Sequence, residues 1–403
     1  MLDKDQLLLD LFQAYYDARK HKRNKSTPLS FEINYESKLF ALHQELVSGT
    51  YTISPSIWFI IRDPVQREVF AADFRDRIVH HLIYNYLYQL FDNHFIYDSY
   101  SCRLGKGTHF GVQRVKRFFR SCSQNFTQEA YVLKMDIKGF FMNIDKAILF
   151  GQVENFLKKY KEQLTIDYDF LLKLIKQTIF HDPTNNCIIK WSKDNRIGLP
   201  PDKSLFSSWN NRWLAIGNLT SQLFANVYLD DLDKYIKHQL WFSYYGRYVD
   251  DFMIVHQDKE KLLETITKIR DFLKDSLHLT LHPKKIYLQE IKKWVLFLGA
   301  YIKPYRTYVR KRTIGKMYHK IQEINQIRSK EKILSTLNSY FGILSHHKSY
   351  RICQKLRKKC NNYIRNTFTP TSDYKKVEPI IKKLKSAEVK KLYPQWYYDG
   401  NLR

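Results

Sequence analysis

Three aspartates stand at positions from which a folded chain could hold divalent cations. Asp136 ends a β-prone run, and Asp250-Asp251 form an acidic turn between two runs of bulky β-forming residues. Carboxylates clustered on rigid neighbouring strands are what phosphoryl transfer with two divalent cations requires. Each signal has a plain alternative, because a lone aspartate usually caps a turn or helix and an Asp-Asp pair is usually a solvated corner. We interpret Asp230-Asp231 as such a corner.

The charge of the chain favours a polyanionic partner. Its 403 residues include 67 Lys and Arg against 40 Asp and Glu, which gives a net charge of +27. Nucleic acid is therefore our first hypothesis, and a basic surface kept for solubility or for membrane binding is the weaker alternative. The hydrophobic share of 44% provides for a large core and for two or three subdomains.

Cysteine usage and the N-terminus indicate a cytoplasmic protein with no membrane partner. The five cysteines form no CxxC pair, which argues against a disulfide framework and a zinc ribbon and is typical of a reducing cytosol. Residues 1–26 are typical of an amphipathic helix rather than a signal peptide, and no apolar run approaches membrane-spanning length. Neither His80-His81 nor His346-His347 has partners at metal-ligand spacing, so we predict ordinary histidines there.

The elements predicted around the aspartates alternate between helices and strands. The spacing predicts helices within 7–46 and at 78–91, 108–119, 217–240 and 259–277, and strands or hairpins within 51–70, 131–137 and 241–256. Residues 181–213 have no clean period and are predicted to form a loop with short strands. From about residue 306 the chain is rich in Lys and Arg at helical spacing, which predicts a separate helical region that contacts nucleic acid.

Several motifs resemble those of reverse transcriptases. Residues 248–251 (YVDD) resemble the tyrosine-x-Asp-Asp hairpin of that family, and residues 134–141 (KMDIKGFF) resemble its first catalytic strand, in the family's order. Further segments resemble the fingers at 66–69 and 75–79, the fingers-to-palm loop at 102–107 and the primer grip at 297–299. Together the matches cover about positions 55–305, so coincidence is a poor explanation for them.

The resemblance implies an α+β fold shaped as a right hand, with fingers, a palm of antiparallel sheet and helices, and a helical thumb. On this basis residues 1–50 form a helical N-terminal extension, residues 51–305 the fingers and palm, and residues 306–403 a basic helical thumb and C-terminal region. The implied activity is RNA-directed DNA polymerisation, in which deoxynucleoside triphosphates extend a primer into cDNA on a template RNA. The implied cofactor is a pair of Mg²⁺ ions, for which Mn²⁺ is an alternative.

The resemblance also implies roles for single residues of the catalytic strands. Asp136, Asp250 and Asp251 would hold the cations, and the carbonyl of Ile137 would be a further ligand. Phe141 matches the aromatic residue that clashes with a ribose 2′-hydroxyl and so favours deoxynucleotides, the alternative being a core aromatic.

Basic residues complete the implied site. Arg67 and Arg62 match residues of the fingers that neutralise the incoming triphosphate, although Arg62 could equally be a solvated turn residue. Lys285 matches a lysine near the leaving pyrophosphate, which makes it a candidate general acid. Its neighbour Lys284 is the alternative assignment.

The segment 216–222 (IGNLTSQ) narrows the resemblance. Most reverse transcriptases have Gln-Gly before this helix and Ser-Pro inside it, whereas this chain has Ile216-Gly217 and Ser221-Gln222. The departure resembles the signature of diversity-generating retroelement enzymes. Membership would imply errors opposite adenines, mutagenic retrohoming into a variable gene, and a small basic helical accessory variability protein as partner. We expect Ile216, Gly217 and Gln222 to contact the nucleotide or template, a simple turn being the alternative for Gly217.

Other classes of function stay open. A retron, group II intron-like or phage-defence reverse transcriptase would keep the chemistry and change the biology. A catalytically silent RNA-binding protein would need only the fold and the basic surface, and the intact set of aspartates argues against it. An RNA polymerase of similar shape is disfavoured by Phe141, because a small or polar residue is expected where ribose must fit.

Overall fold

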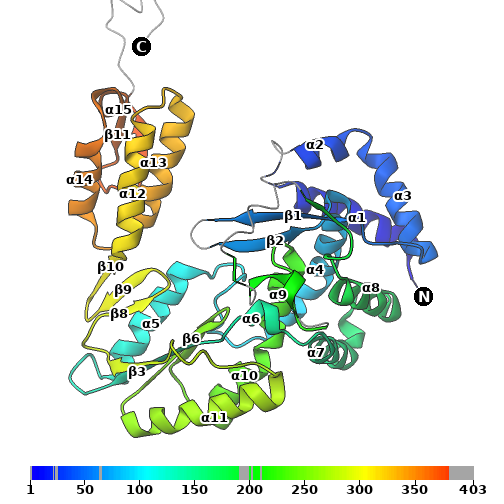
Figure 1. Ribbon diagram of the computed structural model, residues 1–403, viewed down its shortest axis with the longest axis horizontal. Helices are drawn as coiled ribbons and strands as arrows, with labels where there is room; N and C mark the ends of the chain where they lie inside the picture. The colour runs from blue at the N-terminus through cyan, green and yellow to red at the C-terminus, as the bar shows by residue number, and fades with distance from the viewer. Residues whose placement is uncertain are drawn as a thin grey trace, which may run out of the picture. The chain divides into compact units, whose positions relative to one another are not determined.

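The chain divides into two compact units, residues 1–291 and residues 292–403 (Figure 1). The computed structural model describes residues 2–20, 22, 26–62, 66–189, 199–200, 203–208 and 211–380. All of the predicted site residues belong to the first unit. The predicted boundary between palm and thumb, after residue 305, lies inside the second. Within the described ranges no helix is both long and apolar enough to cross a membrane.

Three helices open the first unit: α1 (Lys4–Arg19), α2 (Ser26–Glu32) and α3 (Tyr35–Ser48). Asp3 caps α1 by accepting hydrogen bonds from the amides of Asp5 and Gln6. Leu7 and Leu11 of α1 are buried in the main core, where α1 packs against α4 (Phe74–His94). The apolar stripe of α1 thus joins the N-terminal helices to the rest of the first unit.

A small sheet carries the predicted fingers residues, in the order β2-β1-β4. Its strands are β1 (Ser56–Ile61), β2 (Arg67–Ala71) and β4 (Cys187–Ile189). β1 and β2 pair antiparallel with Ile61 opposite Arg67, and β4 pairs with β1 in parallel. Trp58 and Phe70 form a local core with Trp213. This core fixes the hairpin on which Arg67 stands.

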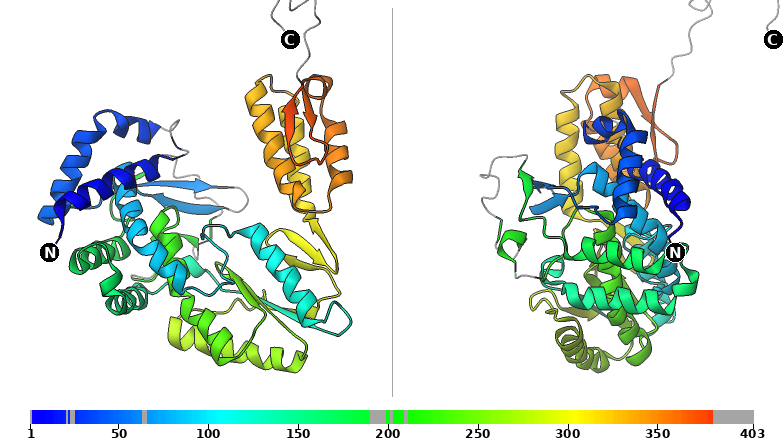
Figure 2. Two further views of the ribbon diagram at one scale, coloured as in Figure 1. Left: turned by 180° about the vertical axis from the view of Figure 1, so that it is seen from behind. Right: turned by 90° about the vertical axis from the view of Figure 1, so that its right-hand side faces the viewer.

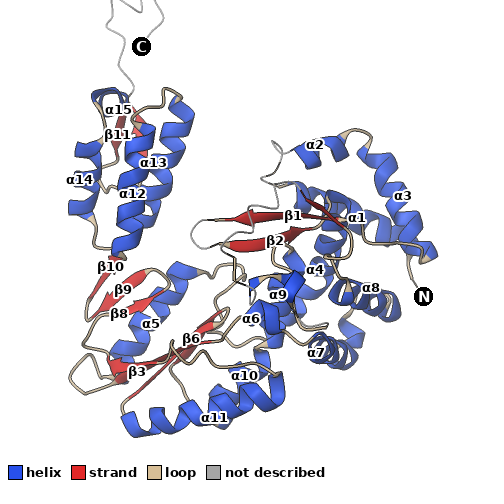
Figure 3. Cartoon of the chain, in the orientation of Figure 1, coloured by secondary structure: helices blue, strands red, loops and turns tan. Residues whose placement is uncertain are grey.

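The second sheet of this unit has four strands in the order β5-β6-β3-β7, and every pairing in it is antiparallel. Figure 3 labels two of its strands, β3 and β6. Its strands are β3 (Tyr131–Asp136), β5 (Tyr245–Tyr248), β6 (Asp251–His256) and β7 (Tyr287–Glu290). The four central residues of β6 are all buried, because helices cover both faces of the sheet. The predicted α+β fold with an antiparallel palm sheet is therefore confirmed.

Helices α5 and α11 lie on opposite faces of this sheet (Figure 1 and Figure 2). The helices of this part are α5 (Thr108–Cys122), α6 (Phe140–Asn143), α7 (Lys146–Lys159), α8 (Tyr168–Phe180), α9 (Leu219–Tyr228), α10 (Asp230–Lys234) and α11 (Lys259–Leu277). Short 3-10 turns occur at Lys161–Gln163 and Leu205–Ser207, and a π-helical turn at Tyr235–Gln239. Leu262, Ile269 and Leu273 of α11 share a core with Leu133 and Phe252 of the sheet.

The second unit contains a strand meander followed by a helical bundle. Its elements are β8 (Val295–Phe297), β9 (Ala300–Lys303), β10 (Arg306–Val309), α12 (Lys311–Ile324), α13 (Lys330–Ser345), α14 (Tyr350–Lys359), α15 (Asn362–Thr367), β11 (Phe368–Pro370) and β12 (Val377–Pro379). The predicted primer grip is the tight turn between β8 and β9, where Leu298 and Gly299 have φ of 47° and 83°. Met317, Ile321 and Leu337 belong to the core of the bundle.

Candidate active site

Strand pairing brings the three predicted aspartates to one end of the central sheet. Asp136, the last residue of β3, lies directly opposite Asp251, the first residue of β6. Residues directly opposite each other in an antiparallel pair share a face of the sheet, so the two carboxylates are cross-strand neighbours. Asp250 precedes Asp251, and its carbonyl accepts a hydrogen bond from the amide of Ile137 at 3.3 Å. Strand pairing thus brings the aspartates of two separate sequence motifs close together in the fold.

The turn that carries Asp250 is strained. Tyr248 pairs with Asp251, so Val249 and Asp250 form a two-residue connection between β5 and β6. Val249 has a φ of 56°, in the left-handed region that β-branched residues avoid. Such a conformation costs about 1–3 kcal/mol and persists only where the surroundings over-determine it. The conformation of this turn therefore lowers the stability of the fold.

The carboxylates repel one another in a largely buried setting. Burial raises the pKa of Asp250, and the carboxylate of Asp136 adds to the effect while Lys285 opposes it. Burial is also the main reason that the pKa of Asp251 is raised to about 6, with Asp136 and Asp250 contributing and Lys134 opposing. A positive charge that comes close to such a cluster therefore stabilises the ionised carboxylates.

Two lysines supply positive charge to the cluster. Lys285 Nζ donates to both carboxylate oxygens of Asp136 at 2.9 Å, and Lys134 Nζ lies 3.2 Å from Asp251 Oδ2. Over the described part of the chain, Asp251 Oδ1 is buried and has no hydrogen-bond partner. No three acidic, His or Cys side chains among the described residues are already grouped to hold a metal ion. The donors still fit a hard divalent cation, because they are repelling carboxylate oxygens of which one is unsatisfied.

A short loop places Lys285 at this end of the sheet. The amide of His282 donates to the carbonyl of Asp136 at 2.8 Å, and the amide of Lys138 donates to the carbonyl of Thr280 at 2.9 Å. These bonds fix the loop to the end of β3. The amide of Lys285 then donates to the carbonyl of His282 at 3.1 Å and closes a turn. The geometry favours Lys285 over its neighbour as the lysine of the site.

The fingers hairpin contributes one arginine that acts on the cluster. Arg67 is exposed at the start of β2, and its positive charge opposes the rise in the pKa of Asp250. Arg62 is exposed just after β1. The structure therefore places Arg67 within electrostatic reach of the carboxylates, as the sequence motif implies, and leaves Arg62 as an exposed residue at the end of the same hairpin.

Phe141 stands on the short helix α6, close behind β3. Gly139, in the left-handed conformation with φ of 56°, begins this helix and turns the chain away from the strand. The ring of Phe141 is half-buried and meets the ring of Phe140 edge-on, with centroids 5.2 Å apart. The backbone carbonyl of Phe141 accepts a hydrogen bond from the amide of Leu214 at 2.7 Å. The ring packs partly on the main core and keeps an exposed portion.

The segment before α9, residues 216–218, is hydrogen-bonded to strand β2 and the residue after it. The carbonyl of Ile216 accepts from the amide of Phe70 at 3.1 Å, and Asn218 Oδ1 accepts from the amide of Ala72 at 3.0 Å. Gly217 has φ of 127°, and a Cβ there would lie 2.8 Å from Val69 Cγ1. The close approach that needs this glycine is thus to β2. Elsewhere in the motif, Ile216 is half-buried and Gln222 is exposed on α9.

One site residue was not singled out in the sequence, and one interpretation needs correction. Lys134 pairs with Asp251, and strand alternation could have indicated it, because residues 134 and 136 share one face. The solvated-corner interpretation of Asp230-Asp231 is wrong for Asp230, which is buried beside Lys234. Burial raises the pKa of Asp230 to about 6, with Lys234 opposing. Asp231 does face solvent, where it accepts from Gln152.

Comparison with known proteins identifies the class. A family described as "Reverse transcriptase (RNA-dependent DNA polymerase)" matches residues 66–302, the stretch that contains every element of the site except Arg62. The match covers more than half of the chain, so the chain belongs to the reverse transcriptase family. The predicted enzyme class, an RNA-directed DNA polymerase, is confirmed.

Among individual proteins, the chain is similar to Protein YkfC of Escherichia coli (strain K12). The two are 21% identical over 297 residues, which is 65% of this chain and 70% of that protein. Solved structures of telomerase also match. That from Candida albicans, with the TWJ fragment of telomeric RNA, has 12% identity and a TM-score of 0.46 over 80% of this chain. Apo telomerase from Candida tropicalis has 11% identity and a TM-score of 0.46. This chain spans 60% and 61% of those two telomerase chains.

Proposed function

We propose that this chain copies a template RNA into cDNA by adding deoxynucleotides to a primer at Asp136, Asp250 and Asp251. The observation that carries the proposal is the cross-strand pairing of Asp136 with Asp251, with Asp250 in the adjoining turn. The net charge of +27 suits a protein that holds a template and primer.

The three carboxylates and the carbonyl of Ile137 are proposed to hold two Mg²⁺ ions, with Mn²⁺ as an alternative. Such cations would activate the 3′-hydroxyl of the primer and hold the triphosphate. Asp251 Oδ1, buried and without a partner among the described residues, is an oxygen ready for this role. Lys285, whose Nζ lies 2.9 Å from Asp136 Oδ1, is proposed to donate a proton toward the leaving pyrophosphate.

Residues around the carboxylates are proposed to select and orient the nucleotide. Arg67 offers a guanidinium that can bind two phosphate oxygens at once, and Arg62 supports it from the end of β1. The exposed portion of Phe141 is proposed to exclude a ribose 2′-hydroxyl. The RNA polymerase alternative is disfavoured on the same ground.

We further propose that synthesis is error-prone opposite adenines, as in a diversity-generating retroelement. Ile216 cannot offer the side-chain amide found in most reverse transcriptases, and Gln222 offers one where they have a proline ring. Both changes are proposed to loosen the checking of base pairs. A small basic helical accessory protein and a cytoplasmic location belong to the same proposal.

Replacing Ile216 with Gln is expected to lower the frequency of errors opposite adenine by about fivefold, because one net hydrogen bond is worth on the order of 1 kcal/mol. Primer extension on a defined RNA template, followed by sequencing of the cDNA, measures it. Ile33→Gln is the matched control, since Ile33 is 68% exposed in the N-terminal region. An unchanged error spectrum in Ile216→Gln would remove Ile216 from the proposal.

The wild-type product separates the remaining alternatives. Errors concentrated opposite adenines support the mutagenic role. Accurate cDNA would refute it and favour a retron, group II intron-like or phage-defence enzyme. No cDNA, even with a candidate accessory protein present, would favour a catalytically silent RNA-binding protein.

A further inference from the structure

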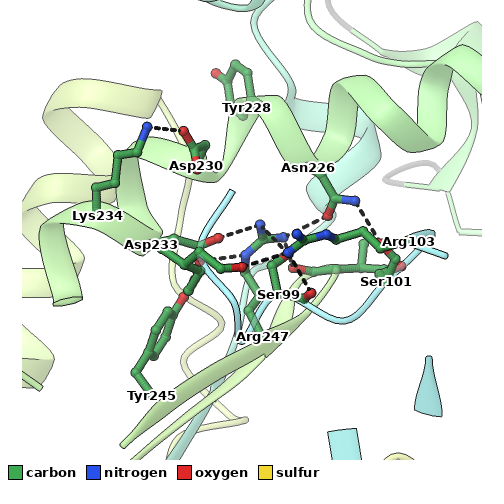
Figure 4. Close-up of polar contacts among 12 residues, drawn as sticks. Ser99, Ser101, Arg103, Asn226, Tyr228, Asp230, Asp233, Lys234, Tyr245 and Arg247 are labelled. Carbon is green, nitrogen blue, oxygen red and sulfur yellow. Dashed lines mark hydrogen bonds and ion pairs between the residues drawn. The ribbon is translucent and has the colours of Figure 1, made fainter. Parts of the chain in front are cut away.

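A fully buried ion pair joins α10 to the hairpin that carries the acidic turn (Figure 4). Arg247 on β5 and Asp233 on α10 are both 0% exposed. Nε and Nη2 of Arg247 donate to the two carboxylate oxygens of Asp233, each at 2.7 Å. The hydroxyl of Tyr245 donates to Asp233 Oδ1 at 2.6 Å. Bidentate pairing of this kind fixes the orientation of the guanidinium as well as its place.

The rest of the Arg247 guanidinium reaches the turn itself. Nη1 donates to the carbonyl of Val249 at 3.1 Å and to Asn226 Oδ1 at 3.3 Å, and Nη2 also donates to Ser99 Oγ at 3.3 Å. With the two bonds to Asp233, each of the five N–H groups of an arginine has an acceptor. Arg247 therefore has no freedom to rotate without breaking several bonds.

The backbone of Arg247 is fixed as well. Its amide donates to the carbonyl of Asp98, and its carbonyl accepts from the amide of Tyr100, both at 2.9 Å. The same Asn226 that accepts from Arg247 donates to the carbonyl of Ser101 at 2.8 Å. The chain from 98 to 101 thus lies beside β5 and holds the backbone of Arg247.

The energetics of the pair do not explain it as a device for stability. Two charges lose their hydration on burial, and replacing such a pair by apolar residues of similar volume is often neutral or stabilising. An apolar pair could not donate a hydrogen bond to the carbonyl of Val249. That carbonyl belongs to the residue with φ of 56°, whose strained conformation needs a fixed partner.

We propose that Arg247, oriented by Asp233, is a positioning residue that holds the turn and thereby sets the places of Asp250 and Asp251. This inference rests on the proposed function, in which those two carboxylates hold the cations. The guanidinium of Arg247 is bonded to Asp233 and also to the turn, so the turn keeps one conformation. The distance between the cations and the reacting atoms then stays constant.

The test removes both charges and the tyrosine hydroxyl, so that no charge is left buried alone. The triple variant Tyr245→Phe, Asp233→Leu, Arg247→Met is expected to fold, with its unfolding midpoint close to that of the wild type. Its kcat per folded molecule is expected to fall about 100-fold, since a misplacement of about 1 Å costs that much, with KM for deoxynucleotides little changed. Mn²⁺ binding, followed by electron paramagnetic resonance without substrates, is expected to weaken about tenfold.

The control and a second variant make every outcome decisive. Arg19 on α1 pairs with Glu32 on α2 and touches neither β5 nor residues 98–101, so Arg19→Met breaks an arginine–carboxylate pair in other elements and is expected to keep the wild-type kcat. If the triple variant fails to fold, Arg247→Lys keeps the charge beside Asp233 but loses the fork that reaches Val249, and a fall in its kcat supports the proposal. Wild-type kcat and Mn²⁺ affinity in a folded variant would overturn it. Loss of Mn²⁺ affinity in a chain that makes no cDNA would uphold the positioning role and reject the polymerase function.

Discussion

Asp251→Asn is expected to abolish most of the activity while making the folded chain more stable. The rate of nucleotide addition should fall on the order of 10³-fold, because a cation ligand supplies several kcal/mol of transition-state stabilisation. The free energy of unfolding at neutral pH, with a chelator present, should rise on the order of 2 kcal/mol. The gain follows from the raised pKa of Asp251, for which burial is the first cause and the neighbouring carboxylates the second.

The sign of the pH dependence follows from the direction of that shift. The pKa of Asp251 is raised from 3.8 to about 6 on folding, so the contribution of this residue to stability is greatest below pH 3.8 and is lost as the pH rises toward 6. Asparagine does not titrate. The stability difference between variant and wild type should therefore grow between those two values and then level off, as urea unfolding across that range would show.

Asp231→Asn is the matched control for this prediction. Asp231 is an exposed carboxylate that accepts a hydrogen bond from Gln152, away from the sheet end. Its replacement should leave the rate of nucleotide addition close to that of the wild type. If Asp251→Asn is less stable than the wild type at neutral pH, burial and the neighbouring carboxylates do not oppose the ionisation of Asp251 as the geometry implies.

Gly217→Ala is expected to lower the free energy of unfolding by about 2–4 kcal/mol. A Cβ at this position would lie 2.8 Å from Val69 Cγ1 and 3.2 Å from the carbonyl oxygen of Phe70, at a φ of 127° that alanine rarely adopts. Backbone strain and overpacking each cost about 1–3 kcal/mol. Urea unfolding of variant and wild type measures the loss.

The control for this prediction is a glycine in a tolerant place. Gly151 lies inside α7 and Gly342 inside α13, and, apart from the adjacent residues and the helix's own backbone, no described atom lies within 4 Å of a Cβ built on either. Gly151→Ala and Gly342→Ala should be neutral or stabilising by about 1 kcal/mol, because alanine favours a helix. A Gly217→Ala variant as stable as these would mean that the glycine serves the bound nucleic acid instead of the packing against β2.

The aspartates could be found in the sequence because their signal is local. Asp136 ends one β-prone run and Asp250-Asp251 separate two others, so the strand and the hairpin follow from residue types alone. Their pairing does not. The register that sets Asp136 opposite Asp251 joins strands far apart in the chain, and only the fold determines it.

The burial of polar partners could not be predicted from the sequence, for a related reason. Arg247 and Asp233 are charged residues of ordinary appearance, and their burial depends on α10 packing against β5. The prediction that Asp230 faces solvent is wrong. An Asp-Asp pair is usually solvated, whereas here the side chain of Asp230 is buried and pairs with Lys234. The close approach of Gly217 to β2 likewise involves a strand distant in sequence, so the spacing of residues could not indicate it.

The central claim is that Asp136, Asp250 and Asp251 form the site of RNA-directed DNA synthesis. Its most direct test is primer extension on a defined RNA template with Mg²⁺ and deoxynucleotides, comparing the wild type with Asp250→Asn and with the Asp231→Asn control. We predict cDNA from the wild type and the control and none from Asp250→Asn, with all three chains equally folded. Equal cDNA synthesis by Asp250→Asn would contradict the account, because the acidic turn would then not be where the reaction takes place.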